Sequence, residues 1–267
     1  MLYGTVSTGY RAGGVADRLA PLGAQIYKPE YVTNYEAGIR TRWFDHRLSI
    51  NATGFHMKYT DLQVTTLLQQ PGVTPSPVTL NAAKASISGV EVEAAWKATS
   101  VDLFGVYISA LRSEFDSFPN GSDGFLSVTG TANNALTAGG YPKLTLQNSD
   151  YSGNYLPNAP RFSARVSYQH EFSLGSGGKL APIVNAYYQS SSFLDASNEP
   201  ASERAAYANV DLSLRYDSAS RKFFVEPYCY NLTDKRPIAT ESTGWGLMSH
   251  SYAPPRRYGI RVGFNLD

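Results

Sequence analysis

The sequence predicts an all-β protein, an antiparallel up-and-down transmembrane β-barrel of which about ten strands are present. Three observations indicate this fold. Apolar and polar residues alternate with a period of two over many segments, whereas helical spacing is almost absent. Long connections alternate with short ones along the chain. Charged residues make up only 17% of the chain, which is low against about 25% for a typical soluble domain.

The first half of the chain supplies five predicted strands. Residues 2–10 are the first strand. Residues 34–43 set Tyr35, Ala37 and Ile39 against polar neighbours. In residues 48–63 and 85–97 the alternation changes phase near Gly54 and Gly89, and a glycine at such a change predicts a β-bulge. The fifth strand covers residues 101–112.

The second half supplies five more predicted strands. Residues 161–169 and 206–216 alternate cleanly, with Val166 and Val210 on their apolar faces. The final strand, residues 256–266, alternates from Tyr258 onward. The two remaining strands have a weaker pattern and cover residues 179–190 and 222–232.

The connections divide into two classes, which places every long loop at one end of the sheet. The long loops are residues 11–32, 64–84, 113–159, 191–205 and 233–255. The tight turns are residues 45–47, 98–100, 174–178 and 217–221. Bacterial outer-membrane barrels combine short periplasmic turns with long extracellular loops. A strand of about 10 residues, tilted by about 45°, also matches an apolar band about 25 Å tall.

Aromatic residues gather beside the tight turns. Amphipathic rings favour the membrane–water interface, so they predict a girdle there. These residues are Trp43, Phe44, Trp96, Phe172, Tyr216 and Phe223.

The charged side of the strands is expected to line the lumen of a closed barrel, because hydrocarbon forces every backbone polar group to pair within the protein. Such a density of charge indicates a wide lumen that is wet or plugged, in which Asp211 is expected to be a solvated charge. The expected lumen-facing residues are Arg40, Arg42, Glu91, Glu93, Arg165, Asp211, Arg215 and Arg261.

Six short motifs, in this order, resemble the C-terminal barrel of TonB-dependent outer-membrane receptors. They are Gly9-Tyr10-Arg11-Ala12-Gly13-Gly14, Pro29-Glu30 with Asn34-Tyr35-Glu36-Ala37-Gly38, Asp61-Leu62-Gln63-Val64, Asn81-Ala82-Ala83-Lys84-Ala85 with Gly89-Val90-Glu91, Asn231-Leu232-Thr233-Asp234-Lys235, and Pro255-Arg256-Arg257-Tyr258-Gly259. Each motif alone is weakly specific, but together they cover nearly the whole chain.

The resemblance implies a barrel of about 22 strands with an N-terminal plug, in which residues 1–267 are the C-terminal portion. It also implies an outer-membrane location and energy-coupled import of a scarce nutrient, most often a ferric siderophore. The expected partners are membrane lipid, the siderophore, and the TonB complex through an N-terminal region that this chain lacks. No cofactor is expected. The expected ligand contacts are aromatic or Arg side chains, which suit planar anionic chelates: Tyr10, Arg11, Tyr187, Tyr188, Trp245 and Tyr252.

The sequence also bears on other functions. The net charge of +1 offers no basic surface for nucleic acid. The four histidines have no metal-ligand spacing, and no catalytic motif occurs, so no enzyme is expected. A passive pore, an adhesive barrel and a soluble β-sandwich stay open as alternatives. The chain starts without a signal peptide, which indicates either a cytoplasmic protein or a missing beginning, and the resemblance favours the latter.

Overall fold

A computed structural model describes residues 1–15, 26–68, 76–119, 121, 126–128, 144–146, 149–175, 177–244 and 247–265. Its main element is one large antiparallel sheet whose strands follow the order β1-β4-β5-β6-β7-β10-β12-β15-β16-β19, with β11 pairing beside β12. Each of these ten strands pairs with the next one along that order, so the predicted up-and-down topology is confirmed. The strands are β1 (Leu2–Arg11), β4 (Glu30–Trp43), β5 (Leu48–Leu68), β6 (Ser76–Lys97), β7 (Asp102–Ser117), β10 (Phe162–His170), β11 (Phe172–Ser173), β12 (Lys179–Gln189), β15 (Tyr207–Asp217), β16 (Phe223–Tyr230) and β19 (Arg257–Phe264).

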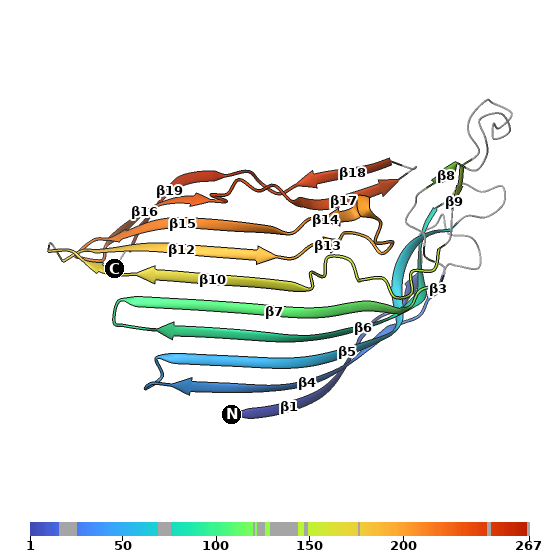
Figure 1. Cartoon of the computed structure of the whole chain (residues 1–267), viewed down its shortest axis with the longest axis horizontal. Coiled ribbons are helices and arrows are strands. Elements are labelled where there is room, and N and C mark those ends of the chain that lie inside the picture. Colours follow the sequence, from blue (N-terminus) through green and yellow to red (C-terminus); the bar gives the residue numbers. More distant parts are fainter. Residues whose placement is uncertain are drawn as a thin grey trace.

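The long connections all leave the same end of the sheet, and the tight turns join strands at the opposite end, as predicted (Figure 1). We call these the loop end and the turn end. Small hairpins and one 3-10 turn decorate the loop end: β2 (Gly14–Val15) with β3 (Ile26–Tyr27), β8 (Leu126–Val128) with β9 (Leu144–Leu146), β13 (Ser192–Phe193) with β14 (Glu203–Arg204), β17 (Ile238–Gly244) with β18 (Leu247–Tyr252), and η1 (Pro200–Ser202).

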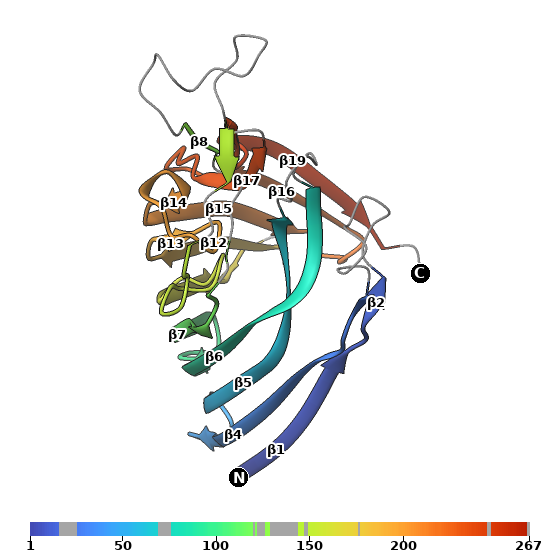
Figure 2. The same cartoon turned by 90° about the vertical axis from the view of Figure 1, so that its right-hand side faces the viewer.

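The sheet curves into an open arc (Figure 2). Strands β1 and β19 are its two edges, and neither pairs with the other among the described residues. The arc therefore has the curvature of a barrel wall without closing on itself.

The predicted long loop 64–84 is wrong, because most of it continues β5 and β6 as an extended hairpin. The sequence pattern misses this extension because the register shifts between Tyr59 and Gln63. Asp61 adopts a left-handed backbone with φ of 53° at this point. Such a bulge interrupts the alternation while the hydrogen-bonded ladder continues above it.

The two predicted glycine bulges are also wrong. Gly54 pairs with Val90, and Phe55 pairs with Gly89, without any shift in register. A Cβ atom at position 89 would lie 2.6 Å from Leu111 Cδ2 and 2.8 Å from Phe55 Cζ. Glycine is therefore needed there to make room for these two side chains. The change of phase in the apolar–polar alternation reflects this packing and not an inserted residue.

The register divides the sheet into an apolar face and a polar face. One row on the apolar face joins Ile39, Ala52, Val92 and Ile108 across four strands. Large side chains on this face are exposed, including Val6 at 68% and Ile260 at 70%. A water-soluble protein rarely exposes such a continuous apolar surface, whereas a lipid-facing wall requires one.

The small buried core lies on the polar face at the loop end. Ala85, Phe115, Phe118 and Tyr151 are its centre, and side chains from the loop before β10 and from the loop after β12 pack against it. Phe118 and Tyr151 meet edge to face with ring centroids 5.5 Å apart. This core fixes the loops above the polar face.

Candidate functional site

The polar face carries all eight charged residues that were expected to face the lumen. Successive cross-strand partners link Arg40 through Asn51, Glu93 and Tyr107 to Arg165. The same alternation places the other expected charges on this face, namely Arg42, Glu91, Asp211, Arg215 and Arg261.

Several of these charges have partners within the sheet. Glu226, only 8% exposed, lies 3.1 Å from Arg261 and 3.9 Å from Arg215. Arg215 also pairs with Asp217 at 2.8 Å. A buried carboxylate is stable only when it is paired or hydrogen-bonded in this way. These residues therefore form an ionic ladder along β15, β16 and β19.

Asp211, expected from the sequence to be a solvated charge, also has a hydrogen-bonding role in the structure. Its Oδ1 accepts the backbone N–H of Asn231 at 2.8 Å. Asp211 is therefore a structural partner of the turn that follows β16.

The predicted aromatic girdle lies on the apolar face beside the turns. Trp43, Trp96 and Tyr168 belong to one cross-strand row. Phe104, in the same row, stacks on Trp96 at 5.5 Å and on Tyr168 at 4.6 Å between centroids. A second group of rings lies beside the turns near the edge strand, where Phe223 contacts Tyr216 and Phe264 with ring centroids 6.1 and 6.4 Å apart.

A cluster of Arg, Tyr and Gln side chains lies at the loop end of the polar face. The Arg165 guanidinium carbon is 5.9 Å from the centroid of the Tyr187 ring, and this ring is 5.9 Å from that of Tyr207. Both tyrosine hydroxyls donate to Gln189 Oε1, at 2.8 Å from Tyr187 and 3.3 Å from Tyr207. Asn209, opposite Tyr187, has a buried side-chain oxygen with no hydrogen-bond partner among the described residues.

Arg165 is exposed and forms no ion pair with a carboxylate in the described structure, so its charge is available. A free guanidinium beside a phenol ring can hold a planar or anionic ligand by stacking and by charge. We call Arg165, Tyr187, Gln189, Tyr207 and Asn209 the loop-end cluster.

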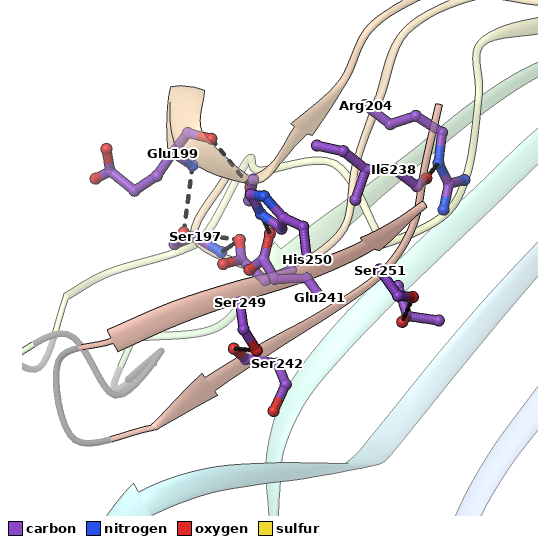
Figure 3. Close-up of polar contacts among 12 residues, drawn as sticks. Ser197, Glu199, Arg204, Ile238, Glu241, Ser242, Ser249, His250 and Ser251 are labelled. Carbon is purple, nitrogen blue, oxygen red and sulfur yellow. Dashed lines mark hydrogen bonds and ion pairs between the residues drawn. The ribbon is translucent and has the colours of Figure 1, made fainter. Parts of the chain in front are cut away.

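Arg204 ties three loop segments together above this cluster. Its guanidinium donates to the carbonyl oxygen of Ile238 at 2.5 Å and to that of Ala239 at 2.8 Å. It also donates to Asn158 Oδ1 at 3.1 Å. Figure 3 shows Arg204 beside Ile238, at the base of the β17–β18 hairpin. Truncating Arg204 would leave these carbonyl groups unpaired and loosen the mouth of the sheet.

The β17–β18 hairpin carries a cross-strand pair of a carboxylate and an imidazole side chain. Glu241 lies opposite His250, and their side chains approach to 3.3 Å (Figure 3). The Glu241 side chain is 4% exposed and that of His250 is 22% exposed. The pair therefore faces the neighbouring loops more than solvent.

Four of the sequence motifs meet at one place beside β1. Gln63 donates its side-chain N–H groups to the carbonyl oxygens of Arg11, Ala12 and Lys28. Its backbone N–H donates to Glu30 Oε2 at 2.8 Å. A neighbouring amide, Asn81, donates to Lys28 and Asp61 carbonyl oxygens in the same way. These motif residues satisfy backbone groups where the chain leaves the sheet.

The Asn231 motif closes the base of the last long loop. Asn231, 7% exposed and with φ of 56°, donates to the carbonyl oxygens of Lys235 and Pro254. Asp234 Oδ1 accepts the backbone N–H of Arg256 at 2.9 Å. This bond, followed by the contact with Arg236, holds the pKa of Asp234 below its ordinary value of 3.8. Hydrogen bonds thus join the two C-terminal motifs at the base of this loop.

The six expected ligand contacts do not come together. Arg11 and Tyr187 are on the polar face, whereas the alternation places Tyr10 and Tyr188 on the apolar face. Tyr252 ends β18 with 61% exposure, and Trp245 lies outside the described residues. Gln189, Tyr207 and Asn209 were not among the contacts expected from the sequence. Counting the strand register back from Asp211 would have placed Tyr207 and Asn209 on the same face as Tyr187.

The described residues contain no group of three or more His, Cys, Asp or Glu side chains arranged to hold a metal ion. They also contain no helix that is long and apolar enough to cross a membrane.

Comparison with known families gives one match, to the family described as TonB dependent receptor-like, beta-barrel, over residues 1–232. Among characterised proteins, the pesticin receptor of Yersinia pestis is 25% identical over 266 residues. That alignment covers 99% of this chain and 33% of the pesticin receptor. The pesticin receptor of Yersinia enterocolitica is 24% identical with the same coverage.

Solved structures share the fold. The ferric yersiniabactin uptake receptor FyuA from Yersinia pestis superposes with a TM-score of 0.72 at 24% identity, covering 98% of this chain and 34% of that one. The siderophore receptor PiuA from Acinetobacter baumannii gives a TM-score of 0.69 at 18% identity, covering 98% and 33%. The chain therefore spans about a third of the length of the proteins that it matches. These matches exclude the soluble β-sandwich considered from the sequence.

Proposed function

Because the chain belongs to the family of TonB-dependent receptor β-barrels, we propose that it forms part of the wall of an outer-membrane receptor that imports a ferric siderophore. Proteins of this family are outer-membrane barrels, and the matched structures are siderophore receptors. Import would be energy-coupled through the TonB complex, and the chain would act as a receptor and not as an enzyme. Residues 1–267 would be the C-terminal portion of that receptor.

The loop-end cluster is the observation that carries this proposal. It places an unpaired guanidinium, two phenol rings and an unpartnered amide oxygen on the polar face, below loops that Arg204 joins. A ferric siderophore is a bulky chelate with aromatic or oxygen-rich groups and often a negative charge. Stacking and charge from Arg and Tyr suit such a ligand.

The test measures uptake of radiolabelled iron by a strain that lacks its own ferric-siderophore receptors and expresses the native protein containing this sequence. A panel of catecholate, hydroxamate and phenolate siderophores would be supplied as ferric complexes. We expect uptake of at least one complex, abolished by deletion of TonB. The double variant Arg165→Gln/Tyr187→Ala should weaken binding of that complex by about tenfold, as expected for loss of about 1.4 kcal/mol of cation–π and stacking energy.

The matched control is Arg42→Gln, which removes the same charge from the turn end of the polar face. It should bind like the wild type. Uptake that persists without TonB would instead identify a passive pore. No uptake of any complex, with the protein folded in the membrane, would contradict the siderophore assignment and leave the receptor family intact.

A further inference from the structure

Two tyrosine hydroxyls of the loop-end cluster converge on one buried amide, that of Gln189. Tyr187 precedes Gln189 by two residues on β12, and Tyr207 lies directly opposite Gln189 on β15, so all three side chains share the polar face. The hydroxyl oxygens lie 2.8 and 3.3 Å from Gln189 Oε1. Gln189 is only 6% exposed, whereas both tyrosines are half-buried. The amide is therefore shielded from a ligand that reaches the two rings.

Both hydroxyl groups direct their protons to this amide. A phenol has a single O–H donor, and a side-chain carbonyl oxygen can accept two hydrogen bonds. Because both protons go to Gln189 Oε1, neither Tyr187 nor Tyr207 has a donor left for a ligand in this arrangement. The hydroxyl oxygens keep only lone pairs, which do not attract the acceptor oxygens of a chelate. The part of each tyrosine that a ligand can use is therefore its aromatic ring.

The amide of Gln189 is itself held in place. Its Nε2 donates to the hydroxyl oxygen of Ser192, the first residue of β13, at 3.5 Å. Ser192 is also only 6% exposed. A buried amide retains its hydrogen bonds because an unmade bond is costly where water cannot replace the partner. The two tyrosine rings that donate to this amide therefore have fixed orientations.

The fixed rings lie beside the positive charge of Arg165. This residue is directly opposite Tyr187 on β10, and its guanidinium carbon is 5.9 Å from the centroid of the Tyr187 ring. The rings of Tyr187 and Tyr207 are inclined to each other by 57°. Two inclined rings and a guanidinium offer stacking and edge-to-face contacts together with a positive charge. A ligand that combines aromatic rings with negative charge fits this arrangement.

Ferric siderophores differ in the groups that chelate the iron. Catecholates and phenolates carry aromatic rings beside negatively charged oxygens, whereas hydroxamates chelate through acceptor oxygens and need no ring. Acceptor oxygens gain affinity from hydrogen-bond donors, and Gln189 occupies the two phenol donors here. Aromatic rings gain affinity from ring faces and from a guanidinium, and these stay available. The hydrogen bonds of Gln189 therefore favour aromatic chelates over hydroxamates.

We propose that Gln189 is a positioning residue that determines the ligand class of the loop-end cluster. By accepting both hydroxyl protons, it makes Tyr187 and Tyr207 recognise a ligand through their rings. The cluster then selects ferric catecholate or phenolate chelates over ferric hydroxamates. Gln189 acts through the two tyrosines and does not contact the ligand. This inference rests on the proposed import function and specifies which class of siderophore is imported.

The test measures binding to the purified native protein containing this sequence by isothermal titration calorimetry in detergent. The ligands are ferric enterobactin, a catecholate; ferric pyochelin, a phenolate; and ferrichrome, a hydroxamate without aromatic rings. The wild type should bind one of the aromatic chelates about tenfold more tightly than ferrichrome, or better. Equal or tighter binding of ferrichrome would overturn the proposal and leave siderophore import standing. Binding of none of the three would contradict the proposed function and this inference with it.

Gln189→Leu removes the acceptor from both hydroxyls with little change in side-chain volume. It should lower the affinity for the aromatic chelate about tenfold. It should not weaken binding of ferrichrome, because the freed hydroxyls can donate to acceptor oxygens. The matched control is Gln169→Leu, the same substitution on the polar face near the turn end of β10, and it should bind like the wild type.

A double-mutant cycle separates positioning from a general loss of structure. Tyr187→Phe should weaken binding of the aromatic chelate about fivefold in the wild type, but by less than about twofold in the Gln189→Leu background. The hydroxyl matters in this cycle only because Gln189 accepts its proton. Independent losses that multiply in the double variant would overturn the proposal. So would an equal loss of affinity for both ligand classes in Gln189→Leu, which is the signature of a purely structural role.

Discussion

Val166→Arg tests the division of the sheet into a lipid-facing and a solvent-facing side. Val166 is the middle residue of β10 and is 46% exposed on the apolar face. An Arg there must place its guanidinium in hydrocarbon, which costs about 2–4 kcal/mol at the centre of a barrel wall. Because position 166 is at the middle of the strand, the Arg side chain is far from both membrane–water interfaces and cannot easily reach either one. We therefore expect unfolding free energy to fall by about 3 kcal/mol.

The matched control for Val166→Arg is Asn185→Arg. Asn185 lies on the polar face of β12, opposite Ser167 and beside Asp211. A new Arg there meets water and a carboxylate, so the change should stay within about 0.5 kcal/mol. Urea unfolding of the native protein in phospholipid vesicles would measure both values. Equal costs for the two variants, or a larger cost for Asn185→Arg, would refute the assignment of faces.

Three further predictions concern packing and hydrogen bonds. Gly89→Ala should destabilise the sheet by about 1–3 kcal/mol by overpacking, whereas Gly54→Ala, whose Cβ would have no neighbour closer than 4.0 Å, should be near neutral in the same unfolding assay. Asp211→Ala should cost about 1 kcal/mol, because a backbone N–H of the turn after β16 loses its acceptor; a cost near zero would restore the solvated-charge interpretation. Asp234 has a lowered pKa through its bond from Arg256, so its contribution is complete above pH 3.8 and is lost as the pH falls through the lower, folded-state pKa. Hydrogen exchange of residues 231–244 should therefore accelerate only in that acid range, and an acceleration between pH 7 and pH 5 would contradict the assignment.

The strand order and the division into faces were predictable because both follow from local patterns. Alternation with a period of two assigns each side chain to a face, so the eight polar-face charges, including Arg165 and Arg261, could be predicted without coordinates. The lengths of the connections assigned each one to an end of the sheet.

The features that the sequence concealed depend on contacts between distant residues. The ladder of β5 and β6 continues through a bulge at Asp61 that resets the alternation, so the extension looked like a loop. The phase change at Gly89 resembles a bulge, but it arises from the space that Phe55 and Leu111 require.

The ligand contacts were the least predictable element. Tyr188 and Tyr252 were expected as contacts because they are aromatic residues in or near long loops. In the structure, Tyr187 and Tyr207 instead share Gln189 as a hydrogen-bond acceptor. Such a grouping depends on the pairing of β12 with β15, and neither segment indicates that register by itself. The hydrogen-bonding role of Asp211 escaped prediction for the same reason, since its partner is 20 residues away.

The central claim is that this sheet is a membrane wall whose polar side contacts water. The most direct test of this claim is the accessibility of single cysteines along β10 to a water-soluble reagent. Single cysteines would replace Ala164, Arg165, Val166 and Ser167 in turn, with Cys229 changed to serine, and intact cells would be treated with a membrane-impermeant maleimide. We expect labelling at positions 165 and 167 and protection by lipid at 164 and 166. Uniform labelling, or labelling of the opposite pair, would contradict it.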